Sequence, residues 1–208
     1  MKKLFLLQIL VLMSLSAVSQ SEGLFSVSET KKIVFSQGNL QYHKDSNVWR
    51  FAEDQLLYLG ENNNNIETGG TWIDLFGWGT GDNPTLSSTV PGDYKEFVDW
   101  GVNSIQNDSL TTWRTLTSDE WDYLCNKRPN AKWLCKHVYV EGKLGLMLLP
   151  DGTDIHPGEN SRMNKYYLLN LERSGKIFLP AAGRRNGKAY QEAGGLYWTS
   201  SGGGNYGY

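Results

Sequence analysis

Short stretches in the first quarter of the chain alternate large apolar with polar residues, which is the two-residue period of half-buried β-strands. Residues 25–27 and 32–35 predict a first pair of strands, joined by a turn at residues 28–31. Residues 38–42 and 48–52 predict a second pair. We therefore expect antiparallel hairpins in this part of the chain.

The pattern becomes helical at residues 117–127. Thr117 can accept a hydrogen bond from the free N–H groups of the first turn, and Glu120, three residues later, can reach back to the N–H of the cap. Trp121 and Leu124 then share one face of the helix. This capping pattern is the strongest helix signal in the sequence, and we expect its tryptophan in the core.

Three other stretches predict helices. Ser161 is expected to cap a helix that ends at Gly175, because a residue in the left-handed region suits a helix C-terminus. Residues 53–59 predict one or two helical turns closed by Gly60. Residues 94–100 predict a short helix.

In the second half of the chain, apolar runs predict the centre of a sheet. Residues 138–140 and 144–149 read as a hairpin of central strands, and residues 177–180 resume extended structure. Residues 184–195 predict a polar, glycine-containing loop, and residues 196–200 a last strand. The pattern as a whole indicates an α+β fold with two main helices against short, mostly antiparallel strands.

Residues 61–91 are rich in Asn, Gly, Thr and Asp, which disfavours regular ladders. Trp72, Phe76 and Trp78 stand among them, whereas a disordered linker carries few aromatic residues. We therefore expect a long ordered loop that is pinned to the domain by these side chains. For Trp72 and Trp78, as for Trp198, we favour packing over ligand binding.

The N-terminal residues resemble a secretory signal peptide. Lys2 and Lys3 are followed by the apolar stretch 4–13, and cleavage is expected after Ser19. A membrane anchor is the competing interpretation, but the stretch is short for a span. We expect residues 1–19 to be a signal peptide and residues 20–208 a single domain that does not insert into the membrane, located in the periplasm, at the cell surface or outside the cell.

Composition limits the partners. The 22 acidic and 20 basic residues give a net charge of -2, so no long-range positive field attracts nucleic acid, and we expect no nucleic-acid partner. Only 39% of the residues are hydrophobic, but 12% are aromatic, including eight Trp and 11 Tyr. The core must therefore use few, large, planar side chains, which can also form binding surfaces.

Cys125 and Cys135 are the only cysteines. In an oxidising compartment, two cysteines ten residues apart could bridge a helix end to the following strand. Alternatively, both are small buried apolar residues. The sequence leaves both interpretations open, because it does not give the distance between the two Cβ atoms.

Three blocks carry a resemblance to a known family. Residues 113–124, 178–184 and 197–201 read WRTLTSDEWDYL, FLPAAGR and YWTSS. They resemble the C-type-lectin-like fold of formylglycine-generating enzyme and its non-catalytic secreted relatives, the Fibrobacter succinogenes major paralogous domains of Bacteroidetes-type bacteria. The resemblance spans about residues 35–201 and implies a C-type-lectin-like fold with long ordered loops. Relatives continue with further strands, so C-terminal strands are expected to be missing and the domain truncated.

The resemblance does not bring catalytic residues with it. The enzyme family oxidises with cysteines or iron-binding histidines in its carboxyl-terminal half, and this chain has no cysteine after Cys135. His43, His137 and His156 lack ligand spacing on one element. We expect no catalytic residue, no metal and no cofactor. The acidic residues near the turn 150–152 could bind calcium, but turn chemistry explains them better.

In the resembling secreted relatives, ligand-facing positions follow the block that matches residues 197–201. The segment from Gly202 to Tyr208 corresponds to the start of those positions. We expect a ligand site at Tyr190, Asn205, Tyr206 and Tyr208, because all four stand among glycine and polar residues. The expected function is binding of a protein or glycan by a secreted or cell-surface, non-enzymatic domain. The alternatives are an oxidoreductase of the formylglycine-generating type and a structural component of a surface assembly.

Overall fold

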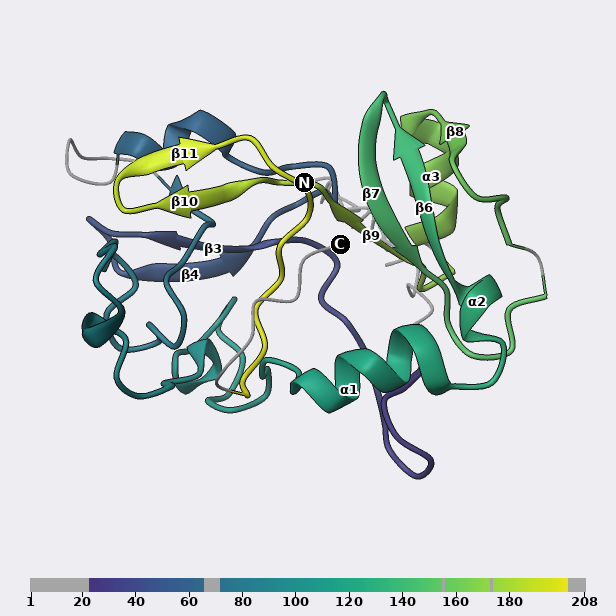
Figure 1. Cartoon of the computed structure of the whole chain (residues 1–208), viewed down its shortest axis with the longest axis horizontal. Helices are drawn as coiled ribbons and strands as arrows, with labels where there is room; N and C mark the ends of the chain where they lie inside the picture. The colour runs from purple at the N-terminus through teal and green to yellow at the C-terminus, as the bar shows by residue number, and fades with distance from the viewer. Residues whose placement is uncertain (1–22, 66–71, 155, 173, 202–208) are drawn as a thin grey trace, which may run out of the picture.

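The computed structural model describes residues 23–65, 72–154, 156–172 and 174–201. Two regions lie side by side in it (Figure 1). The four-stranded region consists of the sheet β8-β6-β7-β9, helices α1–α3 and the hairpin β1–β2. The aromatic region consists of the sheet β4-β3-β5, the hairpin β10–β11 and the loops of residues 74–115. Since strands and helices both occur and most strand pairs are antiparallel, the fold is α+β as expected.

The hairpins predicted for the first quarter of the chain are confirmed. Their strands are β1 (Phe25–Ser26), β2 (Lys32–Ile33), β3 (Leu40–His43) and β4 (Val48–Phe51). A further strand, β5 (Trp72–Ile73), pairs with β3 and was not expected, because residues 61–91 predicted only a loop. The loop prediction holds for most of the remaining described residues of that segment, which are irregular or in short 3-10 turns, η1 (Gly60–Asn65) and η2 (Pro91–Asp93).

The central hairpin is also confirmed. Strands β6 (Cys135–Val140) and β7 (Lys143–Leu148) are antiparallel and occupy the middle of the sheet, between β8 (Ser161–Met163) and β9 (Ile177–Pro180). The two residues of their turn, Glu141 and Gly142, have φ values of 49° and 78°. Positive φ at both positions is the geometry of a tight two-residue hairpin turn, which matches the right-handed twist of the strands.

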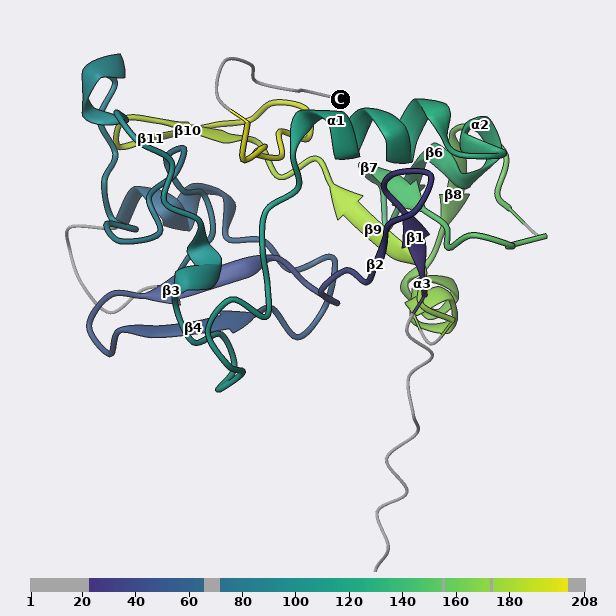
Figure 2. The ribbon, with the colours of Figure 1, turned by 90° about the horizontal axis from the view of Figure 1, so that it is seen from below.

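Alternation along β7 gives the sheet two buried faces. Leu146 and Leu148 pack with Phe25, Trp121 and Leu124, so β1 and helix α1 cover one face. Met147 and Leu149 pack on the other face with Leu168 of helix α3 (Lys165–Glu172). Figure 2 shows α1 and α3 on opposite sides of the sheet. Side chains of successive strand residues point to opposite faces, which is why one strand serves both cores.

The helix predicted at residues 117–127 is present as α1 (Ser118–Asp122), which continues in a π-helical turn, η4 (Tyr123–Lys127). Thr117 accepts the N–H of Glu120, and Glu120 accepts the N–H of Thr117, so the predicted capping box is confirmed. Trp121 is 7% exposed and Leu124 is fully buried. A four-residue helix, α2 (Ala131–Leu134), follows before β6.

The cap predicted at Ser161 is wrong. Ser161 pairs with Val138 in the parallel ladder of β8 and β6, so its backbone is extended. The helix begins at Lys165, and its cap is Asn164, three residues after Ser161. The Asn164 side chain accepts the N–H of Tyr167. Serine and asparagine are both good N-cap residues. The ladder with β6 keeps Ser161 extended, so Asn164 becomes the cap.

The helices predicted at residues 53–59 and 94–100 are absent. The Asp54 side chain accepts the N–H of Leu56, a local turn that competes with helix formation. In the same way Asp99 accepts the N–H of Gly101 and starts the 3-10 turn η3 (Trp100–Val102). Short side chains with acceptors thus redirect the backbone at both places.

Two predictions near the end of the chain are also wrong. Residues 184–195, expected as a loop, contain the hairpin β10 (Arg184–Asn186) and β11 (Ala189–Gln191). Residues 196–200, expected as a strand, form no strand. Their carbonyl groups bind indole N–H groups instead, since Trp78 donates to Thr199 O at 2.9 Å and Trp121 to Trp198 O at 3.4 Å.

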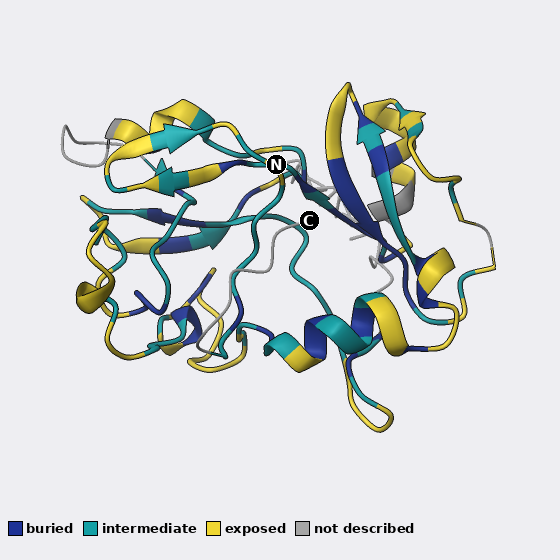
Figure 3. Ribbon diagram, in the orientation of Figure 1, coloured by how far each residue is buried: buried dark blue, intermediate teal, exposed yellow. Residues whose placement is uncertain are grey.

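The two regions have different cores. Buried residues of the four-stranded region are mainly aliphatic, whereas the core of the aromatic region consists of Tyr42, Trp49, Ile73, Trp100 and Ile105 with further aromatic rings around it. Figure 3 shows buried positions along β6, β7 and β9 and within β3. No helix among the described residues is long and apolar enough to cross a membrane.

Candidate ligand-binding cavity

A cavity of about 510 Å³ lies between the two regions. Residues 33–36 and Trp121 line it from the four-stranded region, and Phe51, residues 74–76 and residues 99–101 from the aromatic region. Its aromatic lining consists of Phe35, Phe51, Phe76, Trp100, Trp113, Trp121, Tyr197 and Trp198. A volume in this range accommodates a small organic molecule, a sugar unit or a side chain of a partner.

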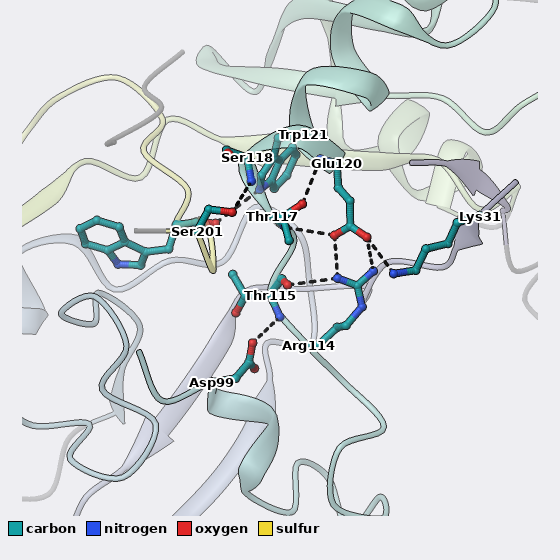
Figure 4. A network of polar contacts seen from close by, with 10 residues as sticks. Lys31, Asp99, Arg114, Thr115, Thr117, Ser118, Glu120, Trp121 and Ser201 are labelled. Carbon is teal, nitrogen blue, oxygen red and sulfur yellow. Dashed lines mark hydrogen bonds and ion pairs between the residues drawn. The ribbon is translucent and has the colours of Figure 1, made fainter. Parts of the chain in front are cut away.

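Glu120 organises the start of α1 beside the cavity (Figure 4). Its carboxylate accepts both Nη atoms of Arg114, at 2.7 and 2.8 Å, the Lys31 ammonium at 2.8 Å and the N–H of Thr117. Burial favours the neutral acid, but these hydrogen bonds outweigh it and lower the pKa of Glu120 from 4.5 to about 2. Glu120 therefore stays ionised and holds the hairpin β1–β2, residue 114 and α1 together.

The segment after the hairpin β10–β11 is fastened to the same helix start. Ser200 N–H donates to Leu116 O at 2.9 Å, and Ser118 N–H donates to the Ser201 hydroxyl at 3.2 Å (Figure 4). The sequence blocks 113–124 and 197–201 are thus in direct contact. Together they form one side of the cavity, because Leu116, Trp121, Tyr197 and Trp198 all line it.

Indole and phenol groups hold residues 197–199 by hydrogen bonds. Trp198 Nε1 donates to Phe76 O and the Tyr197 hydroxyl to Pro180 O, both at 2.8 Å. Burial raises the pKa of Tyr197 far above its usual range, so the hydroxyl stays a donor. Trp78 Nε1 donates to Thr199 O, and both bonds are of the kind expected for packed indoles, although Trp198 also lines the cavity, so the preference for packing over ligand binding stays a prediction. Trp72 packs beneath the Arg50 guanidinium, 3.7 Å from the ring centroid.

The cavity lining also contains polar groups. Asp74 accepts the N–H of Leu59 at 2.8 Å and the Asn63 amide at 2.9 Å, and burial raises its pKa despite these bonds. Arg185 donates to Leu86 O, but its Nη1 is buried without an acceptor, as is Nε1 of Trp100. A ligand could satisfy these two donors only after a side-chain shift, because neither atom is exposed to solvent.

Of the four residues expected to bind ligand, the described part of the chain contains only Tyr190. It lies half-buried in β11, where its N–H donates to the Asn64 side chain. Its ring lies over Gly183, at which any side chain would collide with it, and φ of Gly183 is 79°. Tyr190 does not line the cavity, but β10 of the same hairpin does. Asn205, Tyr206 and Tyr208 lie outside the described residues.

The side chains of Cys125 and Cys135 are in contact, and the structure draws no disulfide between them. The Cys125 thiol hydrogen-bonds to the sulfur of Cys135, and Arg128 Nη2 lies 3.7 Å from the same sulfur. The hydrogen bond from Cys125 and the nearby guanidinium lower the pKa of Cys135 to about 7, although burial opposes the shift. The contact is compatible with either predicted interpretation, so the disulfide stays a prediction.

The three histidines lie apart. His43 bonds to Ser46, His137 to Glu159, and the His156 ring stacks on Trp133 at 5.4 Å. The described residues contain no group of three or more His, Cys, Asp or Glu placed to hold a metal ion. Asp151, one of the acids considered for calcium, instead accepts from Ser26, Lys32 and Arg128 and ties β1 to the end of β7.

Sequence reasoning missed the cavity and the residues that contribute its polar groups. Asp74 and Trp100 lie in stretches without regular periodicity, and Arg185 follows directly on a block used for the resemblance. The only available signal was the density of aromatic residues at positions 72–121, which indicated packing as strongly as binding.

Comparison of the chain with protein-family models, with curated proteins and with solved structures found no match. The resemblance to the C-type-lectin-like family therefore stays a prediction, and the cavity has to be interpreted from its own residues.

Proposed function

We propose that the chain is a secreted or cell-surface, non-enzymatic binding domain of C-type-lectin-like architecture that recognises a protein or glycan ligand. The observation that carries this proposal is the cavity of about 510 Å³ between the two regions, with its largely aromatic lining. Most small-ligand sites are concave and mainly apolar, with a few polar groups that orient the ligand. Asp74, Arg184 and Arg185 provide such groups here.

The chemistry of the lining suits ligands that have flat apolar faces and polar edges. Indole and phenol rings stack on the C–H faces of sugars and also anchor protein partners. Trp113 is suited to this role because it is half-buried, and its Nε1 bonds to Asp108 at the surface. Its ring packs edge to face on Phe51, with centroids 4.7 Å apart, which fixes its orientation.

The position of the cavity supports recognition by the carboxyl-terminal part of the chain. Strand β10 and residues 196–198 form one wall. Residues 202–208, which include Asn205, Tyr206 and Tyr208, follow directly on Ser201, and Ser201 is fastened to the start of α1 beside this wall. The described part of the chain thus ends beside the cavity, and residues 202–208 themselves lie outside the described residues.

The test is a binding screen of residues 20–208 on a glycan array and on a panel of extracellular proteins, followed by titration of each hit. Trp113→Ala is expected to weaken binding tenfold or more, because central aromatic residues dominate such interfaces. Trp133→Ala is the matched control, since Trp133 is 44% exposed and does not line the cavity. Absence of saturable binding, or equal affinities of wild type and Trp113→Ala, would refute the proposal.

Two other functions would give different results. An oxidoreductase of the formylglycine-generating type is favoured by one observation, the contact between the Cys125 and Cys135 thiols. It would show bound copper or iron after purification and would convert a peptide cysteine. A structural component of a surface assembly would self-associate in a concentration-dependent way without ligand in sedimentation velocity.

A further inference from the structure

From the geometry around Cys125 and Cys135 we infer that the pair is a thiol–disulfide exchange site. Cys135 is the attacking sulfur, Cys125 is the second thiol that completes the bond, and the oxidant is a disulfide of the glutathione class or of a protein dithiol partner. The product is a disulfide that joins the end of the helix α1–η4 to the start of β6. The inference does not depend on the proposed binding function.

The fold brings the two sulfur atoms together from different elements. Cys125 lies in the π-helical turn η4, and Cys135 is the first residue of β6, ten residues later. Both side chains pack against the same buried cluster, which contains Phe25 and Trp121. The Cys125 thiol hydrogen-bonds to the Cys135 sulfur, and both residues are only partly buried. Both residues keep some solvent exposure, and the second sulfur is already in place.

A buried cation distinguishes Cys135 from an ordinary buried thiol. The Arg128 side chain is 0% exposed; its Nη2 lies 3.7 Å from the Cys135 sulfur and donates to Leu134 O. Its Nη1 bonds to Asp151 at 3.2 Å, and its Nε has no acceptor. A buried guanidinium stabilises a neighbouring thiolate over a thiol.

The other charged groups around Arg128 only partly reduce its stabilisation of the Cys135 thiolate. Asp151 is shared, because it also accepts from the Lys32 ammonium at 3.2 Å and from the Ser26 hydroxyl and N–H. Lys32 adds a second positive charge on the same side. Arg128 is thus not fully neutralised by Asp151, and its charge also acts on the sulfur of Cys135.

The reaction balances in two steps. The Cys135 thiolate attacks one sulfur of the oxidant, the S–S bond of the oxidant breaks, and one thiolate leaves. The Cys125 thiol then loses its proton to solvent and attacks the Cys135 sulfur, which expels the second thiolate of the oxidant. Overall, two electrons and two protons pass from the cysteine pair to the oxidant.

The expected consequence is a stabilised helix end. The bridge closes the segment 125–135, which contains α2 and the left-handed Asn130. A loop of this length is expected to raise the melting temperature by roughly 5–10 °C.

The experiment treats residues 20–208 with oxidised glutathione at pH 7 and follows free thiols, intact mass and the melting temperature. We expect loss of both thiols, a mass decrease of two hydrogens and the rise in melting temperature. Two thiols that persist, a stable glutathione adduct as the end product, or a bridge without a change in melting temperature would each overturn the inference.

Single-cysteine variants test the assigned roles. Cys125→Ser should trap glutathione on Cys135, and its Cys135 should be alkylated at pH 7 at least tenfold faster than Cys125 in Cys135→Ser. Cys125→Ala, which lacks the hydrogen-bond donor that serine retains, should shift the pH midpoint of Cys135 alkylation upward relative to Cys125→Ser. Equal or reversed alkylation rates, or identical midpoints, would contradict the roles, and unchanged circular dichroism would confirm that the variants are folded.

Discussion

The four-stranded region and the aromatic region are held together by different kinds of interaction. In the first, long backbone ladders align aliphatic side chains, and Val138, Met147 and Leu148 are completely buried. In the second, ladders are short, and Trp78, Trp198 and Asn63 hold the chain by bonding to backbone groups of distant segments. A ladder satisfies backbone groups regardless of side chain, whereas the second arrangement depends on individual residues.

This difference explains where the cavity lies. Interdigitated aliphatic side chains fill the space on both faces of the four-stranded sheet. In the aromatic region, large planar rings pack at mixed angles, as between Phe76 and Trp100, whose planes meet at 44°. The cavity occurs at the boundary between the two kinds of packing, with Trp121 on one side and Trp113 on the other.

The largest effect is expected from Trp121→Ala, because Trp121 belongs to the aliphatic core and also lines the cavity. Loss of this buried indole should lower the free energy of unfolding by about 3–5 kcal/mol. Urea unfolding followed by circular dichroism measures this change in the free energy of unfolding. A loss below about 1 kcal/mol would mean that the two regions are stable without their shared tryptophan.

An intermediate effect is expected from Glu120→Gln, which removes the charge that links Lys31, Arg114 and the cap of α1. The loss at neutral pH should be about 1–3 kcal/mol. Because the folded-state pKa of Glu120 is lowered from 4.5 to about 2, its contribution is complete above pH 4.5 and disappears as the pH falls towards 2. The stability difference between wild type and variant should therefore shrink over that range in urea titrations. A difference that does not change with pH would show that the charge is not responsible.

The smallest effect is expected from Trp198→Phe, which keeps an aromatic ring but removes the indole donor to Phe76 O. The unfolding free energy should fall by about 1 kcal/mol. Amide hydrogen exchange should accelerate at residues 76–101 and stay unchanged in β6 and β7. Trp133→Phe is the control, since Trp133 is an exposed residue. Equal acceleration in both regions would contradict the view that the indole bond of Trp198 stabilises the aromatic region in particular.

Local signals predicted the elements whose partners are close in sequence. The capping box of Thr117 and Glu120, the hairpin of residues 138–149 and the first two hairpins follow from residues a few positions apart. The helices predicted at residues 53–59 and 94–100 failed because of local side-chain acceptors, whereas two other predictions failed because a distant partner decided the outcome. Ser161 became a strand residue because β6 offered a ladder, and residues 196–200 lost their strand to indole donors from Trp78 and Trp121.

The candidate site depended still more on distant contacts. Tyr190 was predicted from its polar surroundings and does not line the cavity, whereas Arg185, Trp100 and Asp74 were not predicted and do. Sequence spacing cannot bring residues 35, 100 and 198 together, because each lies on a different element. The sequence also left the contact between Cys125 and Cys135 undecided. This contact depends on the relative positions of η4 and the start of β6, which local patterns do not give.

The sequence by itself determined the α+β class, the capped helix, the central hairpin and the scarcity of aliphatic residues in one part of the chain. Those features arise from hydrogen bonds and periodicities within about a dozen residues. The tertiary structure alone decided the pairing of β5 with β3, the cavity, the Glu120 network and the position of Arg128 beside a thiol. Each of these needs groups more than a dozen residues apart or on separate elements, and their free energy is gained only after the chain has folded around them.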